Sequence, residues 1–210
     1  MQIILDGLGK KFNKTWIFKD VRTRFEANKA YAILGANGSG KSTLLQVIAC
    51  FLTPSAGSVR YVENNADVLI DDVYKRIAVS TPYMELIEEF TLMEMLDFHS
   101  VMKPFRHPLK PTDLIEITGL GASAHKQIKY FSSGMKQRVR LVLALLTDVP
   151  VVFLDEPTTN LDEQGVRWYN DLVQQHRKDR ILVVCSNHIQ SEYGFCDEVF
   201  DLSKHKENLS

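Results

Sequence analysis

Apolar residues follow two patterns along the chain, short unbroken runs and positions three or four residues apart. Residues 31–34 form an apolar run that predicts a strand, and residues 42–52 carry Leu44, Leu45, Ile48 and Leu52 at helical spacing. Glycines are concentrated in the stretch between them. The pattern therefore predicts a strand, a tight loop and a helix in direct succession.

The same two patterns continue through the rest of the chain. Strands are predicted at residues 58–62, 76–80, 151–154, 181–185 and 198–202. Helices are predicted at 139–146 and 166–173. Residues 82–134 are predicted to form a helical lobe, in which Thr91 and Glu94 have the spacing of a capping box. Strands that alternate with helices predict an α/β fold with a parallel sheet covered on both faces.

Composition narrows the possible partners. The chain has 210 residues, of which 45% are hydrophobic, enough for a core. Lys and Arg total 25 against 26 Asp and Glu, so no overall positive charge attracts nucleic acid, and no nucleic-acid partner is expected. The longest apolar runs fall far short of the ~20 residues that a membrane helix needs. Cys50, Cys185 and Cys196 lack CxxC spacing, which favours reduced thiols in a cytosolic protein.

The glycine-rich stretch matches the pattern of a phosphate-binding loop. Its members are Gly35, Ala36, Asn37, Gly38, Ser39, Gly40, Lys41 and Ser42, followed by Thr43. The glycines allow successive backbone NH groups to point at phosphate oxygens at the positive end of the following helix. Lys41 is expected to reach the β and γ phosphates of ATP, and Ser42 to bind Mg²⁺. A chance match would not explain the strand and helix on either side.

The predicted strand at 151–154 leads into two acids, Asp155 and Glu156. In a parallel sheet the carboxyl ends of the strands face the ligand crevice. Asp155 is therefore a candidate ligand of Mg²⁺, and Glu156 is a candidate general base for the attacking water. An acidic pair at the end of a strand is often only solvated, and the phosphate loop is what favours the catalytic interpretation.

These features resemble, in their order, the ATP-binding cassette (ABC) ATPases, and the resemblance extends over essentially the whole chain. Residues 131–135 resemble the family signature, with Ser132 and Gly134 matching, residues 160–162 resemble the D-loop, and His188 resembles the switch histidine. The resemblance implies one ABC ATPase domain over residues 1–210. Its P-loop NTPase core would have a mostly parallel sheet and an antiparallel β edge, with a core lobe at about 1–81 and 135–210 and an inserted helical subdomain at about 82–134.

The family pattern also implies how the site is completed. Two cassettes would pair head to tail, each closing Ser132 and Gly134 on the γ-phosphate held by the other. Helix capping is the simpler alternative for Ser132. Phe12 would stack on adenine, with Trp16 as its competitor and core packing as the alternative role for both rings. His188 would assist catalysis beside Lys41 and Glu156.

One position departs from the family pattern. Pro82 stands where the family carries the glutamine of its Q-loop. Proline offers neither a side-chain oxygen nor a backbone NH group. We therefore expect Thr81 or an additional water to complete the metal shell, with hydrolysis that is slow but present.

The function that the resemblance implies is a Mg²⁺-dependent ATPase that powers a membrane transporter. Its partners would be separate transmembrane permease subunits, and it would lie in the cytoplasm on the inner face of the membrane. The short chain is similar to ATPase subunits of bacterial exporters. The alternative is a soluble ABC ATPase of metal-cluster assembly, DNA repair or translation, although repair ATPases insert a long coiled coil and translation factors carry two cassettes. A small-molecule kinase would not explain residues 132–134 or 160–162.

Overall fold

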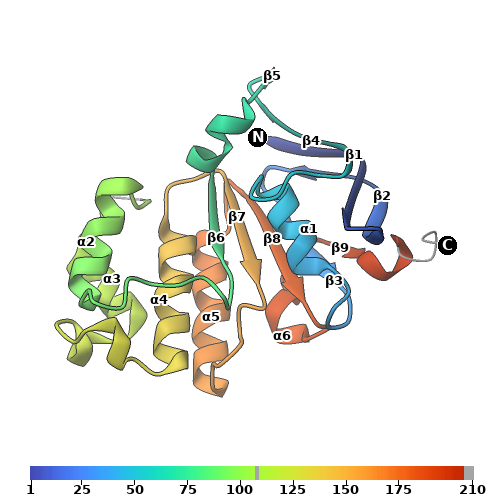
Figure 1. The fold of residues 1–210 in the computed structure, drawn as a ribbon. Coiled ribbons are helices and arrows are strands. Elements are labelled where there is room, and N and C mark those ends of the chain that lie inside the picture. Colours follow the sequence, from blue (N-terminus) through green and yellow to red (C-terminus); the bar gives the residue numbers. More distant parts are fainter. Residues whose placement is uncertain (107–108, 206–210) are drawn as a thin grey trace.

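The strands form two sheets in the computed structural model, which describes residues 1–106 and 109–205 (Figure 1). A parallel sheet has the order β6 (Ile77–Ser80), β7 (Val151–Asp155), β8 (Ile181–Ser186), β3 (Ala30–Leu34) and β9 (Glu198–Asp201). An antiparallel sheet has the order β2 (Thr15–Glu26), β1 (Gln2–Phe12), β4 (Ala56–Glu63) and β5 (Ala66–Asp67). The predicted α/β fold is confirmed, and its antiparallel strands form a sheet of their own.

Side chains of the parallel sheet point alternately into two apolar cores. Val152 of β7 and Val184 of β8 point into a core shared with helices α4 (Ser133–Leu146) and α5 (Glu163–His176). Phe153 and Val183 point into a second core, shared with helix α1 (Lys41–Ile48) and the antiparallel sheet. Figure 1 shows α4 and α5 to the left of strands β6 to β8 and α1 to the right of those strands. Because both faces are covered, these strands are apolar runs without alternation.

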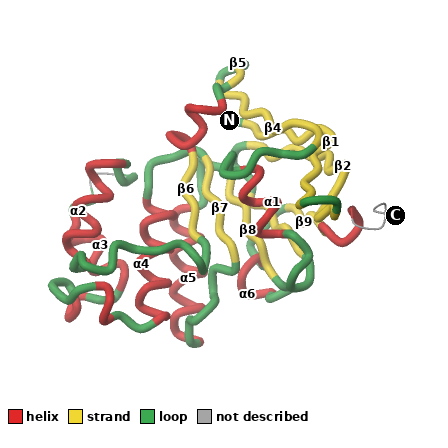
Figure 2. Tube along the Cα trace, in the orientation of Figure 1, coloured by secondary structure: helices red, strands yellow, loops and turns green. Residues whose placement is uncertain are grey.

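The described residues between β6 and α4 form helix α2 (Leu92–Met102), helix α3 (Pro111–Thr118) and two short 3-10 turns (Gly121–Ser123 and Ile128–Tyr130). The predicted capping box begins α2, since Thr91 Oγ1 accepts from the NH group of Glu94 at 3.2 Å and the Glu94 carboxylate accepts from the NH group of Thr91 at 2.8 Å. Figure 2 shows these helices at the end of the molecule opposite the antiparallel strands. The lobe boundaries at residues 82 and 134 stay predictions.

The remaining elements are short. A further 3-10 turn (Ile70–Arg76) precedes β6, helix α6 (Gln190–Tyr193) follows β8, and another 3-10 turn (Leu202–His205) follows β9. The helix predicted to reach residue 52 ends at Ile48, because Cys50 adopts a φ of 61°. No helix within residues 1–106 and 109–205 has the length and apolar character needed to cross a bilayer.

His99 of α2 is a half-buried histidine that the fold holds in its neutral form. Its Nε2 lies 2.7 Å from Oγ1 of Thr147, and its ring stacks on Phe105 with 5.0 Å between the centroids. Burial, with a further contribution from the charge of Lys103, lowers the pKa of His99 from 6.5 to about 4. Between these values the unfolded chain binds a proton that the native protein does not, so stability falls as the pH is lowered from 6.5 towards 4.

We expect the free energy of unfolding to fall between pH 7 and pH 5 by about 2 kcal/mol more in the wild-type protein than in His99→Gln. Urea unfolding at both pH values measures this difference. His125→Gln is the matched control, because His125 is exposed. An identical pH dependence in wild type and His99→Gln would contradict the role given to His99.

Candidate functional site

The glycine-rich loop of residues 35–40 joins the end of β3 to the start of α1. Gly38 and Gly40 have φ values of 71° and 99°, a region that favours glycine. A Cβ on Gly40 would lie 2.4 Å from Cγ2 of Ile17, and a Cβ on Gly35 would lie 2.5 Å from Oγ of Ser39. The loop therefore needs glycine both for its conformation and for its close packing. Since Gly40 is the N-cap of α1 and the first turn carries no acid, the positive end of α1 can receive an anion.

The ammonium of Lys41 is the centre of a hydrogen-bonded chain. Lys41 is 4% exposed, and its Nζ donates to the carbonyl oxygens of Gly35 at 2.9 Å and Ala36 at 3.2 Å and to Oδ1 of Asn187. Asn187 Nδ2 in turn donates to Oε1 of Glu156 at 2.8 Å. The structure thus brings the predicted residues Lys41 and Glu156 together through an amide at the carboxyl ends of the parallel strands.

Asp155 ends β7 as a buried acid with spare acceptor capacity. Burial raises its pKa and the charge of Glu156 adds to this, whereas a hydrogen bond with Ser42 and the charge of Lys41 oppose the shift. Its Oδ1 is buried and accepts no hydrogen bond from the described residues. A carboxylate oxygen beside a serine hydroxyl suits Mg²⁺, which prefers oxygen ligands and shares them with phosphates. Ser42 and Asp155 therefore fit the predicted metal site, where Mg²⁺ would neutralise phosphate charge.

A cavity of about 510 Å³ opens above the phosphate loop. Its lining comes from β2, the phosphate loop, the loop after β6 and the end of β7, and consists of Ile17, Asn37, Gly38, Ser39, Gly40, Lys41, Ser42, Thr43, Pro82, Tyr83, Asp155 and Glu156. Pro82 therefore lies at the predicted position beside the site. Tyr83, which sequence reasoning missed, contributes an exposed ring there, whereas Thr81 is not among the described lining residues.

The aromatic residues predicted for adenine lie on the hairpin of β1 and β2. Phe12 is 47% exposed beside the turn, with Nζ of Lys10 5.2 Å from its ring centroid. Trp16 is half-buried, and Nζ of Lys11 lies 5.4 Å from its ring centroid. Neither ring is among the described residues that line the cavity, although Ile17 of the same hairpin is. The stacking role of Phe12 stays a prediction.

The residues that resemble the family signature lie at the start of α4. Oγ of Ser132 accepts from the NH group of Met135 at 3.2 Å, so the capping role considered for Ser132 is present. A Cβ on Gly134 would lie 2.8 Å from the carbonyl oxygen of Asn160, so only glycine lets α4 and the predicted D-loop approach this closely. Ser132 and Ser133 are exposed. Among the described residues, neither Ser132 nor Gly134 lines the cavity above the phosphate loop.

Comparison with known proteins identifies the family. Residues 18–159 match the family model described as ABC transporter. The chain belongs to this family. It is an ABC ATPase, which confirms the resemblance found in its motifs.

Relatives of this ABC ATPase match it over most of their length. It is 31% identical to the ABC transporter ATP-binding protein NatA of Bacillus subtilis, over 86% of this chain and 76% of NatA. It is 28% identical to the lantibiotic transport ATP-binding protein SrtF of Streptococcus pyogenes, over 90% of this chain and 80% of SrtF. A solved dimeric ATP-binding cassette in a post-hydrolysis state, bound to ADP and Pi, has a TM-score of 0.80 at 22% identity and covers 95% of this chain and 93% of its own. That likeness confirms the predicted fold.

Two further residues of α4 in this ABC ATPase form hydrogen bonds with the loops that follow β7 and β6. The buried Gln137 donates from Nε2 to the carbonyl oxygen of Pro157 at 2.9 Å, directly after the acidic pair. Arg140 donates from Nε to the carbonyl oxygen of Met84 at 2.7 Å, in the loop after β6. These hydrogen bonds hold both loops against α4. Sequence reasoning missed them because a glutamine and an arginine in a helix look like ordinary surface residues.

His188 lies in the loop that follows β8 of this ABC ATPase. It is exposed and has a φ of 63°. Oγ of Ser186 closes the loop by accepting from the NH group of Ile189 at 3.2 Å. His188 is not among the described residues lining the cavity, and its catalytic role stays a prediction. Its neighbour Asn187, to which the motifs assigned no role, makes the hydrogen bonds to Lys41 and Glu156.

Proposed function

We propose that this ABC ATPase binds and hydrolyses Mg·ATP to power a membrane transporter. The observation that carries the proposal is the meeting of the phosphate loop, Lys41, Asp155 and Glu156 at one cavity. Hydrolysis of a phosphoanhydride depends on positioning and charge stabilisation, and these residues supply a phosphate cradle, a cation, a metal ligand and a base.

Each group has a role in the proposed reaction, in which water attacks the γ-phosphorus and ADP leaves. The loop NH groups and Lys41 bind the β and γ phosphates. All three donors of Lys41 are engaged, so Lys41 must release one acceptor to reach a phosphate, and the side chain of Asn187 is the one that can move. Glu156 accepts the proton of the attacking water, and His188 contacts the γ-phosphate. Ser42 and Asp155 would hold Mg²⁺, which would neutralise phosphate charge.

The active form that we propose is a head-to-tail pair of cassettes. The exposed start of α4 presents the hydroxyl of Ser132 and helical NH groups, which are suited to a phosphate. Since Ser132 and Gly134 are not among the described lining of their own cavity, a second molecule would have to receive them. The dimeric form of the solved ATP-binding cassette supports this arrangement.

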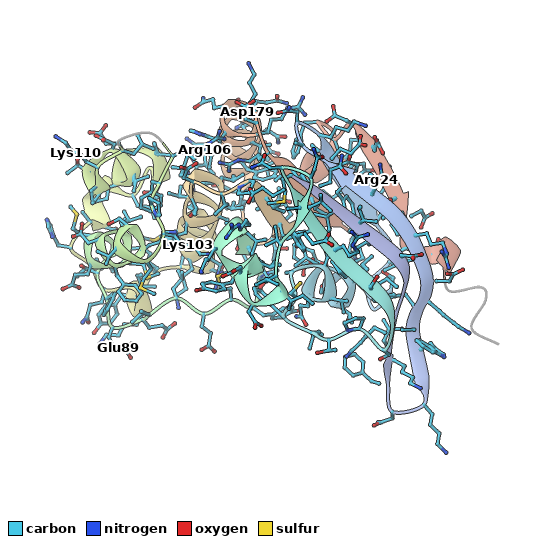
Figure 3. All side chains as sticks on the ribbon, turned by 90° about the horizontal axis from the view of Figure 1, so that it is seen from above. Arg24, Glu89, Lys103, Arg106, Lys110 and Asp179 are labelled. Atoms are coloured by element: carbon cyan, nitrogen blue, oxygen red, sulfur yellow. The ribbon has the colours of Figure 1, made fainter. Side chains whose placement is uncertain are left out.

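An apolar groove of about 430 Å³ between the turn at Ile70–Arg76, β6 and α2 supports a transporter role. Phe51, Tyr74 and Met102 line it and are exposed. Glu85 forms part of its wall, and Glu89, on the same loop, projects at the outer edge of the helical region (Figure 3). We assign the groove to a cytoplasmic segment of a membrane-spanning permease that presents apolar residues.

Met102→Glu tests this assignment, because it places a charge in the groove. We expect the wild-type chain to co-purify a membrane-spanning partner from detergent-solubilised membranes of its own source, and Met102→Glu to lose it. Val101→Glu is the matched control, since Val101 is adjacent and 85% exposed but does not line the groove. Mass spectrometry identifies the partner. Equal capture by both variants would contradict the assigned groove.

We propose that the protein lies on the inner face of the membrane and drives export. The relative named for lantibiotic transport supports a transport role. ATP-dependent accumulation of cargo inside inverted vesicles would establish export, and accumulation in right-side-out vesicles would contradict it. Capture of water-soluble proteins alone would favour a soluble ABC ATPase instead.

A further inference from the structure

Glu192 is a buried acid that the proposed reaction does not use. It lies on the short helix α6 and is 0% exposed. Its Oε1 accepts from the NH group of Thr158 at 3.2 Å and from Oγ1 of the same residue at 2.8 Å. Its Oε2 accepts from Oγ of Ser186 at 2.5 Å. Burying a carboxylate is costly unless donors compensate it. Among the described residues the donors are Thr158, in the loop after β7, and Ser186, at the end of β8 where the next loop begins.

Those two loops carry the residues proposed for catalysis. Thr158 follows Glu156 by two positions, and Ser186 precedes His188 by two positions. The Glu192 carboxylate thus bridges the loop after β7 and Ser186, the last residue of β8, at which the His188 loop begins, using one oxygen for each. It is a side-chain tie between the two segments, placed on the buried side of both.

Both catalytic positions need such support. Glu156 and His188 have φ values of 45° and 63°, in the left-handed region that is unfavourable for residues other than glycine. Such conformations are strained and persist only where the surroundings hold them. In the first loop a backbone hydrogen bond begins at the strained residue, from Thr159 N to Glu156 O at 3.1 Å. In the second, the NH group of Ile189 donates to Oγ of Ser186 across His188 at 3.2 Å. Asn187 links the loops on the cavity side through its hydrogen bond to Glu156, and Glu192 adds a second side-chain link on their buried side.

We infer that Glu192 is a positioning residue for ATP hydrolysis, which holds the Glu156 loop and the His188 loop at a fixed spacing. The inference rests on the proposed roles of Glu156 and His188. A carboxylate suits the task because it can accept all three hydrogen bonds at once, whereas the amide nitrogen of a glutamine cannot accept any. Glu192 acts through the loops and does not touch the substrate.

Glu192→Gln and Glu192→Ala test the inference, because the change in kcat can be compared with the change in ATP affinity. A displacement of about 1 Å in a catalytic group can cost 100-fold, so we expect kcat to fall by about 10- to 100-fold. The Kd for a fluorescent ATP analogue should change less than about twofold, because the phosphate loop is untouched. Steady-state phosphate release and an equilibrium titration measure the two quantities.

Tyr169→Phe is the matched structural control. The hydroxyl of Tyr169 donates to the backbone carbonyl oxygen of Glu192 at 2.9 Å, so its removal loosens α6 and leaves the carboxylate ties in place. We expect Tyr169→Phe to lower the melting temperature with kcat unchanged. Thr158→Val removes the hydroxyl hydrogen bond to Oε1 of Glu192. Ser186→Ala removes the hydrogen bond to Oε2 and also the one from the NH group of Ile189. The part of their effects on kcat that acts through Glu192 should be non-additive.

The outcomes separate this inference from the proposed function. If Glu192→Gln folds and keeps wild-type kcat while Glu156→Gln loses it, the inference is overturned and the proposed function stands. If Tyr169→Phe lowers kcat as much as Glu192→Gln does, the effect is general destabilisation and the inference is again overturned. If Glu156→Gln retains turnover, the proposed function itself fails. Should Glu192→Ala not fold, Glu192→Gln and Thr158→Val give the same test.

Discussion

Replacing Glu156 with glutamine is expected to lower ATP turnover by about 100- to 10,000-fold, the range that a positioned general base contributes. Glutamine keeps the size of the side chain and can still hydrogen-bond to Asn187, which Glu156 meets at 2.8 Å. It cannot take a proton from water. ATP binding should persist, since the phosphate loop and Lys41 are unchanged. Single-turnover phosphate release measures the loss.

The same variant reports on the proposed pair of cassettes. Because bound ATP is no longer cleaved, Glu156→Gln should accumulate as an ATP-bound dimer with doubled mass in gel filtration. Glu163→Gln, the same chemical change on a side chain that is 93% exposed at the start of α5, is the control and should behave as wild type. An ATP-loaded Glu156→Gln that stays monomeric would rule out the paired site.

Replacing Lys41 with alanine is expected to weaken ATP binding by about 10- to 150-fold, the value of a charge-assisted hydrogen bond of about 1.5–3 kcal/mol. The ammonium is buried and directed by Gly35, Ala36 and Asn187, so it is pre-organised for a charged ligand. Isothermal titration with ATP measures the effect. Adenosine should bind equally to wild type and variant, because it lacks phosphates.

Lys14→Ala is the control for this second prediction. Lys14 is an exposed lysine at the turn between β1 and β2, so its removal changes the net charge by the same amount. We expect its ATP affinity to match the wild type. Equal affinity in Lys41→Ala and wild type would show that the loop binds phosphate through backbone NH groups alone.

Local patterns predicted the parts of the fold whose chemistry lies within a few neighbouring residues. The phosphate loop, the capping box of Thr91 and Glu94, and the apolar strand before Asp155 each carry their information in consecutive positions. Strands that are buried on both faces are continuous apolar runs, so their sequence pattern differs clearly from that of a half-exposed strand. The phosphate loop and Asp155 at the end of that strand also line the cavity.

The hairpin of β1 and β2 was not predicted, although it is the longest pair of strands in the described residues. Its register shifts between Leu5 and Leu8 and again beyond Leu8, and Gly7 has a φ of 58°. Each bulge moves side chains to the opposite face and breaks the alternation that a sequence pattern relies on. Only the pairing with β4 and the shared core restore the register.

Asn187 and Glu192 were missed for a different reason. Both follow β8 in a polar segment that reads as a solvated loop and a short helix. Their partners, Lys41, Glu156 and Thr158, lie more than thirty positions away in sequence. A polar side chain reveals such a role only when the fold buries it among distant donors and acceptors.

The two-faced parallel sheet has a consequence for how members of this family can diversify. The phosphate loop helix packs on one face of the sheet, and the helices that adjoin the apolar groove pack on the other. Substitutions that reshape the α2 side of the groove for a new partner are therefore separated from the phosphate loop by the sheet. The helices on that side contact the loops beside the cavity through hydrogen bonds such as those of Gln137 and Arg140. Natural variation can therefore change the groove while the phosphate loop and the acids after β7 stay the same. A chimera that exchanges the helical segment would need to preserve those contacts to keep its ATPase activity.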